Sequence, residues 1–444
     1  MHTTKSWKES FQAFKNRRVL SLALFGFSGG LPNPLILGTL GIWLAECGYS
    51  KTMIGFFAIV SATYPLKFVW APYIDRFKIP FFTRTLGKRR AWIFCTQICV
   101  IIGLTLLSTV NPATDTAAVL LLAAFIGLSS ASQDVSIEAY RIEILDRSLF
   151  GPGAGFGAFG YRIGTLVSGA FALHLSFFFN WAITYRIMAC FMLIGMVTTL
   201  LNPEPIHRQQ EKTPSLKERF VVFESLLYFL KLKEIWALFA LIVFYRFNDA
   251  LIMIMTPQFL LELGYTKVQI ANIAKALGLN MMILGGFTGG LLSTRFGFHV
   301  TLRYAMIAQT CVTLFFVAQA LVGKHLGLLI VTMAVESFSS SLFYATLIGF
   351  FCTLCRNDGT AGADYALLSS FNSGCRVAFS IVSGLLAETL GWVGFFLMIF
   401  ICSSPGIYVI IRYNSAFKNR FNADHYNNTT PLPDTPPPPP CLRS

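Results

Sequence analysis

Apolar runs of about 20 residues recur along the whole 444-residue chain, and they constrain its fold more than any other feature. A helix needs about 20 mostly apolar residues to cross a bilayer. Hydrophobic residues make up 55% of the chain and charged residues only 13%, whereas soluble domains carry roughly 25% charged residues. The sequence therefore predicts an all-α membrane protein with twelve transmembrane helices, at 19–45, 53–75, 91–110, 117–144, 153–178, 182–201, 233–260, 269–295, 300–320, 326–351, 363–388 and 391–412.

Positive charge is distributed unevenly between the predicted loops. The formal charge of +14 would by itself suggest a nucleic-acid partner. Outside the predicted spans, however, the Lys and Arg residues fall on one side of the membrane with three exceptions, Lys51, Lys267 and Lys324. Because Lys and Arg collect in cytoplasmic loops, we expect both termini to be cytoplasmic and expect no nucleic-acid partner.

The chain contains two copies of one unit. LAECGYSKTMIGFFA at 44–58 matches LLELGYTKVQIANIA at 260–274, and Gly160-Tyr161-Arg162 matches Gly374-Cys375-Arg376. Such parallel repeats build the two halves of secondary transporters, with the substrate site between them near the midplane. We therefore expect a cytoplasmic segment (1–18), a six-helix bundle (19–201), a cytoplasmic linker (202–232), a second six-helix bundle (233–412) and a Pro-rich disordered cytoplasmic tail (413–444).

Several motifs resemble a known family. The basic loop that follows 53–75 resembles the major facilitator superfamily, and six stretches are similar to the AmpG family of muropeptide permeases, which is related to the acetyl-coenzyme A transporters. These stretches are GFSGGLPNPL, YPLKFVWAPYIDR, SQDVSIEAYR, GYRIG, FNDALIMIMTPQFLLELGYTKVQI and DYALLSSF. The resemblance covers residues 19 to 412. It implies proton symport of cell-wall-derived anhydro-muropeptides (GlcNAc-anhydroMurNAc peptides) across the bacterial inner membrane, as part of peptidoglycan recycling.

The basic loop has two readings. Orientation by positive charge is one of them. The resemblance implies another, a gating loop in which Asp75 engages a neighbouring helix in one access state. The insertion FKIPFFTRTL makes this loop longer than the usual spacing in the superfamily. Its candidate residues are Asp75, Arg76, Gly87, Lys88, Arg89 and Arg90.

Charged residues lie inside the span 117–144. At 100° per residue, Asp134, Glu138 and Arg141 share one face and Glu143 points the other way. A charge near the bilayer centre costs at least ~2.5–3.5 kcal/mol, so this face should line the bundle interior or a watery cavity. Two acids at i and i+4 repel each other when both are ionised, which favours a proton on one of them. Asp134 and Glu138 are our candidates for proton coupling, and for Arg141 we weigh a structural ion pair with either acid.

Other polar groups inside the spans suit an acidic cargo, because Arg can hold a carboxylate through two parallel hydrogen bonds. Arg246 and Asp249 stand three apart, so a salt bridge competes with a role in binding. Lys67 and Arg162 have no partner within their own spans. The candidate substrate-binding residues are Lys67, Gln133, Tyr161, Arg162, Arg246, Asp249, Lys275 and Arg376.

Other classes of function fit the sequence less well. The chain shows no catalytic constellation, no Walker lysine and no clustered metal ligands, so we expect neither an enzyme nor a cofactor or metal. The expected partners are a sugar-peptide substrate, protons and the bilayer, with a monomeric chain. Glu138 and Asp364 depart from the family pattern, which leaves open another organic anion such as acetyl-coenzyme A. A membrane assembly factor that transports nothing is the remaining alternative.

Overall fold

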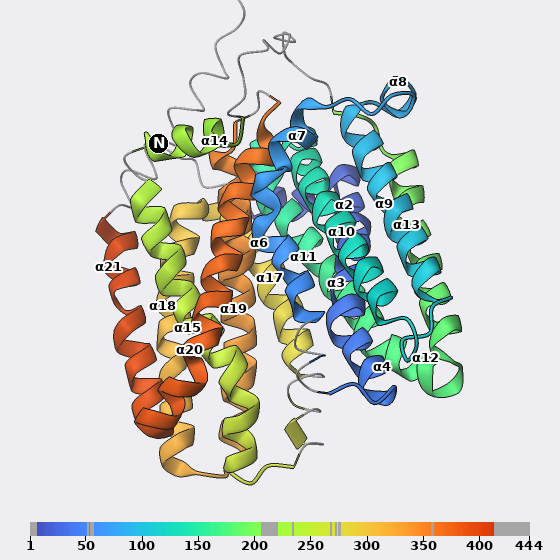
Figure 1. Ribbon diagram of the computed structural model, residues 1–444. Helices are drawn as coiled ribbons and strands as arrows, with labels where there is room; N and C mark the ends of the chain where they lie inside the picture. The colour runs from blue at the N-terminus through green and yellow to red at the C-terminus, as the bar shows by residue number, and fades with distance from the viewer. Residues whose placement is uncertain are drawn as a thin grey trace, which may run out of the picture.

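The computed structural model describes residues 7–50, 53, 57–205, 221–232, 235–266, 269–270, 273, 277–356 and 359–412. Every element assigned within these ranges is a helix, and the long helices run side by side in one bundle (Figure 1). Lys51, Lys267, Lys275, linker residues 206–220 and the tail 413–444 lie outside the described residues. The predicted all-α class is confirmed.

The first half of the chain contains short helices between longer ones. In chain order these are α1 (Trp7–Ala13), α2 (Arg17–Gly30), α3 (Pro32–Pro34), a π-helical segment (Leu35–Thr39), α4 (Leu40–Glu46), a 3-10 helix (Ala58–Ala62), α6 (Thr63–Leu66), a 3-10 helix (Lys67–Val69), α7 (Ala71–Arg76), α8 (Phe82–Leu86), α9 (Lys88–Leu107), α10 (Thr116–Ile144), a 3-10 turn (Arg147–Leu149), α11 (Phe150–Leu166), a π-helical segment (Val167–Phe171), α12 (Ala172–Phe178) and α13 (Trp181–Leu201).

The second half is built from fewer and longer helices. They are α14 (Val221–Leu230), α15 (Ile235–Glu262), α17 (Gly278–Phe296), α18 (Phe298–Val322), α19 (Leu326–Leu354), α20 (Ala361–Ser403) and α21 (Pro405–Arg412). Among them α14 lies across the upper end of the bundle in Figure 1, beside α7.

Among the described residues, eight helices are long and apolar enough to cross a membrane. One of them, Ala361–Arg412, covers two predicted spans, and its backbone is non-helical at Gly391, where φ is 63°. The predicted spans 53–75, 153–178 and 269–295 are not among the eight. The described part of the predicted span 53–75 is helical but alternates between 3-10 and α geometry, and it contains Pro65 and Pro72, which lack a backbone donor. The number twelve stays a prediction.

The internal repeat is visible in local geometry. Gly48 and Gly264, at matching positions, both adopt a positive φ, of 85° and 84°. Just before them, Glu46 accepts a hydrogen bond of 2.7 Å from the Trp181 indole. Its counterpart Glu262 accepts one of 2.6 Å from Trp392. The same residues therefore end the first long helix of each half in the same way.

Among the described residues, the apolar cluster that joins the two halves lies at one end of the bundle. We call the end that carries Arg17, Arg18 and the start of α9 the basic end; it is the upper end in Figure 1. The largest core cluster combines α2 and α10 with α15, α19 and α20, for example Phe25 with Phe343. At the other end, one described cluster belongs to the first half and another to the second half.

Glycines let helices approach backbone to backbone. A Cβ at Gly160 of α11 would collide with the carbonyl oxygen of Ala23 in α2. Between the halves, a Cβ at Gly151 would lie 2.8 Å from the carbonyl oxygen of Gly290 in α17. Small residues at such crossings allow van der Waals packing in lipid, where no hydrophobic effect drives helices together.

We predict opposite effects of alanine at the two repeat-related glycines. Gly160→Ala must separate α11 from α2 and should destabilise the chain by about 1–3 kcal/mol, as overpacking does. Gly374, its counterpart, has no atom within 4 Å of an added Cβ, so Gly374→Ala should leave stability unchanged or raise it by up to about 1 kcal/mol. Melting of both variants in one detergent measures the difference. Equal melting temperatures would contradict the packing argument.

Candidate functional site

A buried ion cluster lies at the basic end. The Arg89 side chain is fully buried and Asp75 is 3% exposed. Arg89 Nη1 lies 2.5 Å from Asp75 Oδ1, and Arg89 Nε donates to Glu143 Oε2 at 2.9 Å. One guanidinium thus serves two carboxylates. Burying charges is costly unless their remaining hydrogen-bonding positions are also satisfied, and the neighbouring helices supply those partners.

The second oxygen of Asp75 connects the two halves. Asp75 Oδ2 accepts a hydrogen bond of 2.6 Å from the backbone N–H of Ala363, in the first turn of α20. A helix N-terminus carries a partial positive charge that favours an anion. A Cβ at Gly362 would lie 2.6 Å from Asp75 Oδ1, so glycine is needed there for the close approach. This contact between α7 and α20 ties the halves together at the basic end.

The Glu204 carboxylate binds backbone N–H groups in the first turn of α9. Gly87 begins this helix with a φ of 88°. The Glu204 carboxylate accepts from the backbone N–H groups of Arg89, at 2.8 Å, and Arg90, at 3.0 Å. Arg90 in turn donates to the carbonyl of Thr199 at 2.8 Å. Lys88 donates to the carbonyl of Asp75. Arg76 ends α7; the other five gating-loop candidates surround one cluster.

The acidic face of α10 meets α2 and α11 in the middle of the bundle. Asp134 is half-buried, and a Cβ at Gly29 of α2 would lie 3.2 Å from its Oδ1. Lys67 and Glu138 lie close enough to Asp134 for their charges to influence its carboxyl group. Tyr161 of α11 is also coupled to Asp134. Four of the candidate residues, from three segments, therefore gather at one place.

Glu138 and Arg141 extend this face toward the basic end. They form an i,i+3 ion pair in which the Glu138 side chain is 21% exposed and that of Arg141 only 5%. Arg141 also reaches the second half, donating to Cys352 Sγ at 3.2 Å, and its guanidinium lies 5.4 Å from the Tyr365 ring centroid. Arg141 thus contacts both halves, which a pattern confined to one helix does not reveal.

Arg246 and Asp249 form a second buried network in α15. Their side chains pair at 2.6 Å. Arg246 Nε donates to Asn372 Oδ1 at 2.7 Å, and Asp249 accepts from Ser340 at 2.7 Å. The Arg246 guanidinium lies 5.0 Å from the Tyr344 ring centroid. Since both charges are buried with several partners, this arrangement favours the salt-bridge alternative.

The remaining binding candidates are dispersed. Gln133 is fully buried and donates to Ser28 at 3.0 Å, which favours packing between α10 and α2. Arg162 is half-buried in α11 and is electrostatically coupled to Glu336 of the second half. Arg376, its repeat counterpart, is exposed, and Lys275 lies outside the described residues. Gln133 and Arg376 do not join the Asp134 cluster, whereas Arg162 lies beside Tyr161, which belongs to it.

Sequence reasoning missed three contributors to these sites. Helical spacing places Glu143 opposite the acidic face, and the sequence places Glu204 in the linker. Asp364 was read as a possible sign of a different cargo, but it is fully buried and accepts two hydrogen bonds from the Arg356 side chain, at 2.9 and 3.0 Å. An acid next to a predicted span end, facing a basic loop, is the signal that would have suggested Glu143 and Glu204.

The fold has solved counterparts. The crystal structure of the transporter FucP in an outward conformation matches 90% of this chain and 99% of its own, with a TM-score of 0.68 and 16% identity. A bacterial homologue of the iron transporter ferroportin, in an outward-facing state, matches with a TM-score of 0.69 and 13% identity over 90% and 100% of the two chains. The Major Facilitator Superfamily model matches residues 18–363. The chain is thus a multi-pass transporter of this class, not an enzyme.

Sequence relatives identify the family within this superfamily to which the chain belongs. The anhydromuropeptide permease of Escherichia coli K12 is 30% identical over 95% of this chain and 84% of its own. A transporter named AmpG 4 from Rickettsia felis is 30% identical over 90% and 97% of the two chains. The chain belongs to the AmpG family, as its motifs indicated.

We predict that the ion cluster around Arg89 is essential for stability. Arg89→Ala would leave Asp75 and Glu143 buried without their cation, and breaking a buried pair in this way costs about 3–5 kcal/mol. Arg84, exposed in α8 of the same loop, is the matched control, and Arg84→Ala should change stability by less than about 0.5 kcal/mol. Thermal unfolding of the purified variants tests this. Similar melting of the two would show that the cluster adds little.

Proposed function

We propose that this chain imports cell-wall-derived anhydro-muropeptides (GlcNAc-anhydroMurNAc peptides) together with protons across the bacterial inner membrane. Two six-helix halves, 19–201 and 233–412, would alternate access to a central site, with both termini in the cytoplasm. The similarity to the E. coli permease along 95% of the chain carries the choice of cargo. Nearly all loop Lys and Arg lie at one end, which supports the orientation.

The contacts at the basic end support a two-state mechanism. Asp75 on α7 binds the start of α20, and the largest apolar core also joins the halves at this end. At the far end the described cores remain separate. In our proposal this is the state closed toward the cytoplasm. Cargo release then requires the gating loop to let go of α20, and cargo must interact differently with the two states to shift their populations.

Asp134 and Glu138 are the proposed proton-coupling residues. Both are half-buried, so a proton could reach them, whereas Asp249 is held by Arg246 and Ser340. Lys67 lies within electrostatic reach of both acids, and Glu138 is also paired with Arg141. Neutralising either acid would therefore release this lysine to a carboxylate of the cargo, which would link proton binding to cargo binding. Arg141 serves mainly as the structural partner of Glu138.

The cargo site itself is proposed around the Asp134 cluster. Lys67, Tyr161 and Arg162 supply cationic and aromatic groups there, from the first half. Muropeptides carry a lactyl carboxylate and acidic peptide residues, which a cation in a low-dielectric cavity attracts. Arg246, Asp249 and Arg376 would contribute from the second half. We expect the transporter to act as a monomer, because one chain holds both halves.

The coupling proposal predicts a specific transport defect. Asp134→Asn or Glu138→Gln should abolish accumulation driven by a pH gradient, down to passive equilibration, while exchange of labelled for unlabelled cargo partly persists. Proteoliposomes with an imposed gradient measure both processes. Asp115→Asn, in an exposed loop, should transport normally. If both acid variants accumulate cargo like the unmodified chain, neither acid carries the proton.

The cargo proposal predicts selectivity. Labelled anhydro-muropeptide should enter proteoliposomes, while labelled acetyl-coenzyme A should not. Lys67→Gln should weaken muropeptide uptake by about tenfold or more, because losing a buried charge partner costs at least about 1.4 kcal/mol. Arg84→Gln is the exposed control. Uptake of acetyl-coenzyme A instead would favour the organic-anion alternative, and no cargo-linked proton flux with either compound would favour an assembly factor.

A further inference from the structure

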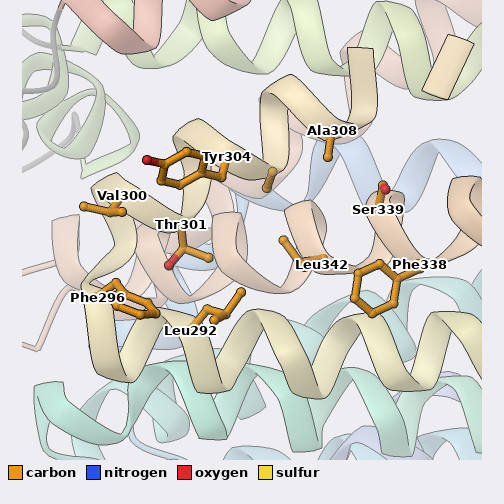
Figure 2. Close-up of a pocket in the computed structure, with 10 residues that line it drawn as sticks. Leu292, Phe296, Val300, Thr301, Tyr304, Ala308, Phe338, Ser339 and Leu342 are labelled. Carbon is orange, nitrogen blue, oxygen red and sulfur yellow. The ribbon is translucent and has the colours of Figure 1, made fainter. Parts of the chain in front are cut away.

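A cavity lies between α17, α18 and α19, away from the acidic face of α10 (Figure 2). Its volume is about 450 Å³. The walls are almost wholly apolar, with Leu292 and Phe296 on α17, Tyr304 on α18, and Phe338 and Leu342 on α19. None of the described proton-coupling or cargo candidates lines it. The cavity is therefore separate from the proposed transport site.

The cavity is a groove that opens on the outer face of the bundle. Tyr304 is 60% exposed and Phe296 39% exposed, and Ala308 is exposed as well. Because these helices belong to a membrane-spanning bundle, outward-facing apolar walls meet lipid rather than water. From Val300 to Ala308 the groove follows α18 for about 12 Å, at about 1.5 Å per residue. That length suits part of an acyl chain and is short for a packed helix.

Two arginines are sequence neighbours of residues that line this groove, where α17 ends and α18 begins: Arg295 precedes Phe296, and Arg303 precedes Tyr304. Arg303 donates to the Tyr304 hydroxyl at 3.1 Å. The Arg295 guanidinium lies 4.0 Å from the Trp7 ring centroid and 5.3 Å from that of Phe296. Arg295 Nε is buried without a hydrogen-bond partner. Among the described residues, neither arginine is paired with a carboxylate. Within the described part of the chain, both cations are therefore available to an anion.

We propose that this groove binds an anionic phospholipid of the bilayer, with one acyl chain along its apolar walls and the phosphate beside Arg295 and Arg303. Arginine binds phosphate through paired, charge-assisted hydrogen bonds. Clusters of basic residues at the membrane surface attract anionic lipids. The order of the groups matches a lipid, since the charges lie at the basic end and the apolar groove runs from there toward the middle of the bundle.

Lipid at this site would act on the contact between the halves. The groove walls α17 and α19 pack closely, for a Cβ at Gly289 would lie 2.7 Å from the carbonyl oxygen of Leu342. On its other side α17 meets α11, where a Cβ at Gly155 would lie 3.2 Å from the carbonyl oxygen of Gly286. A lipid that fills the groove would hold α17 against α11. This contact joins the two halves in the proposed state that is closed toward the cytoplasm.

Lipid binding by the purified full-length chain tests the proposal. The probes are phosphatidylglycerol and phosphatidylcholine with identical acyl chains, followed by native mass spectrometry and by melting in detergent. The unmodified chain should retain phosphatidylglycerol in preference and melt at a higher temperature with it. Replacing both arginines, by Arg295→Gln with Arg303→Gln, should weaken phosphatidylglycerol binding about 30-fold, at about 1 kcal/mol per cation. Arg412→Gln, an exposed arginine at the end of α21, should have no effect.

A second variant tests the groove without touching a charge. Ala308→Trp fills the groove from its exposed side and should reduce retention of both lipids. Leu321→Trp is its control, because Leu321 is 70% exposed on the same helix and lies away from the groove. Equal binding of the two lipids by the unmodified chain would overturn the role of the arginines. Unchanged lipid retention in Ala308→Trp would contradict binding of the acyl chain in the groove. Neither assay uses cargo, so these outcomes are independent of the transport proposal.

Discussion

The cost of placing charge in hydrocarbon organises this molecule. An ionisable side chain within a spanning helix must face protein, water or an opposite charge. Among the described residues, three groups of such charges stand out: around Asp134 on α10, around Arg246 on α15, and around Arg89 at the basic end. Each place lies between helices of different origin. The charges thus fix which faces of α10, α15 and α9 turn inward, while apolar residues such as Leu121, 70% exposed, face outward.

The three charged groups differ in how fully their side chains are paired with hydrogen-bond and ion-pair partners. Arg89 and Arg246 are surrounded by carboxylates and amides at hydrogen-bond distance. Such fully paired networks rigidify a structure. The Asp134 face is less complete, since Asp134 and Glu138 are both half-buried. A group that must take up and release a proton or a cargo needs this freedom. The paired networks around Arg89 and Arg246 therefore suit a structural role, and the half-buried acids around Asp134 suit a role in transport.

Much of the architecture can be predicted from the sequence. The apolar runs predicted the membrane class, and the repeat around Glu46 and Glu262 predicted equivalent halves, which the matching Trp181 and Trp392 contacts display. Helix interruptions were harder to read. Proline marks a missing donor, but whether the chain continues as a π or 3-10 segment depends on neighbouring helices. The alternation of 3-10 and α segments between Ala58 and Arg76 is such a case.

The sequence by itself determined the membrane class, the repeat, the family and the one-faced stripe of Asp134, Glu138 and Arg141, because all of these depend on local order or helical spacing. Only the tertiary structure decided which charges meet. Asp75 binds Ala363 across 288 positions, Arg89 joins Glu143 of another helix, and Arg141 reaches Cys352 of the other half. Pairing over such distances depends on how whole helices pack, and helical periodicity within one segment carries no information about its neighbours.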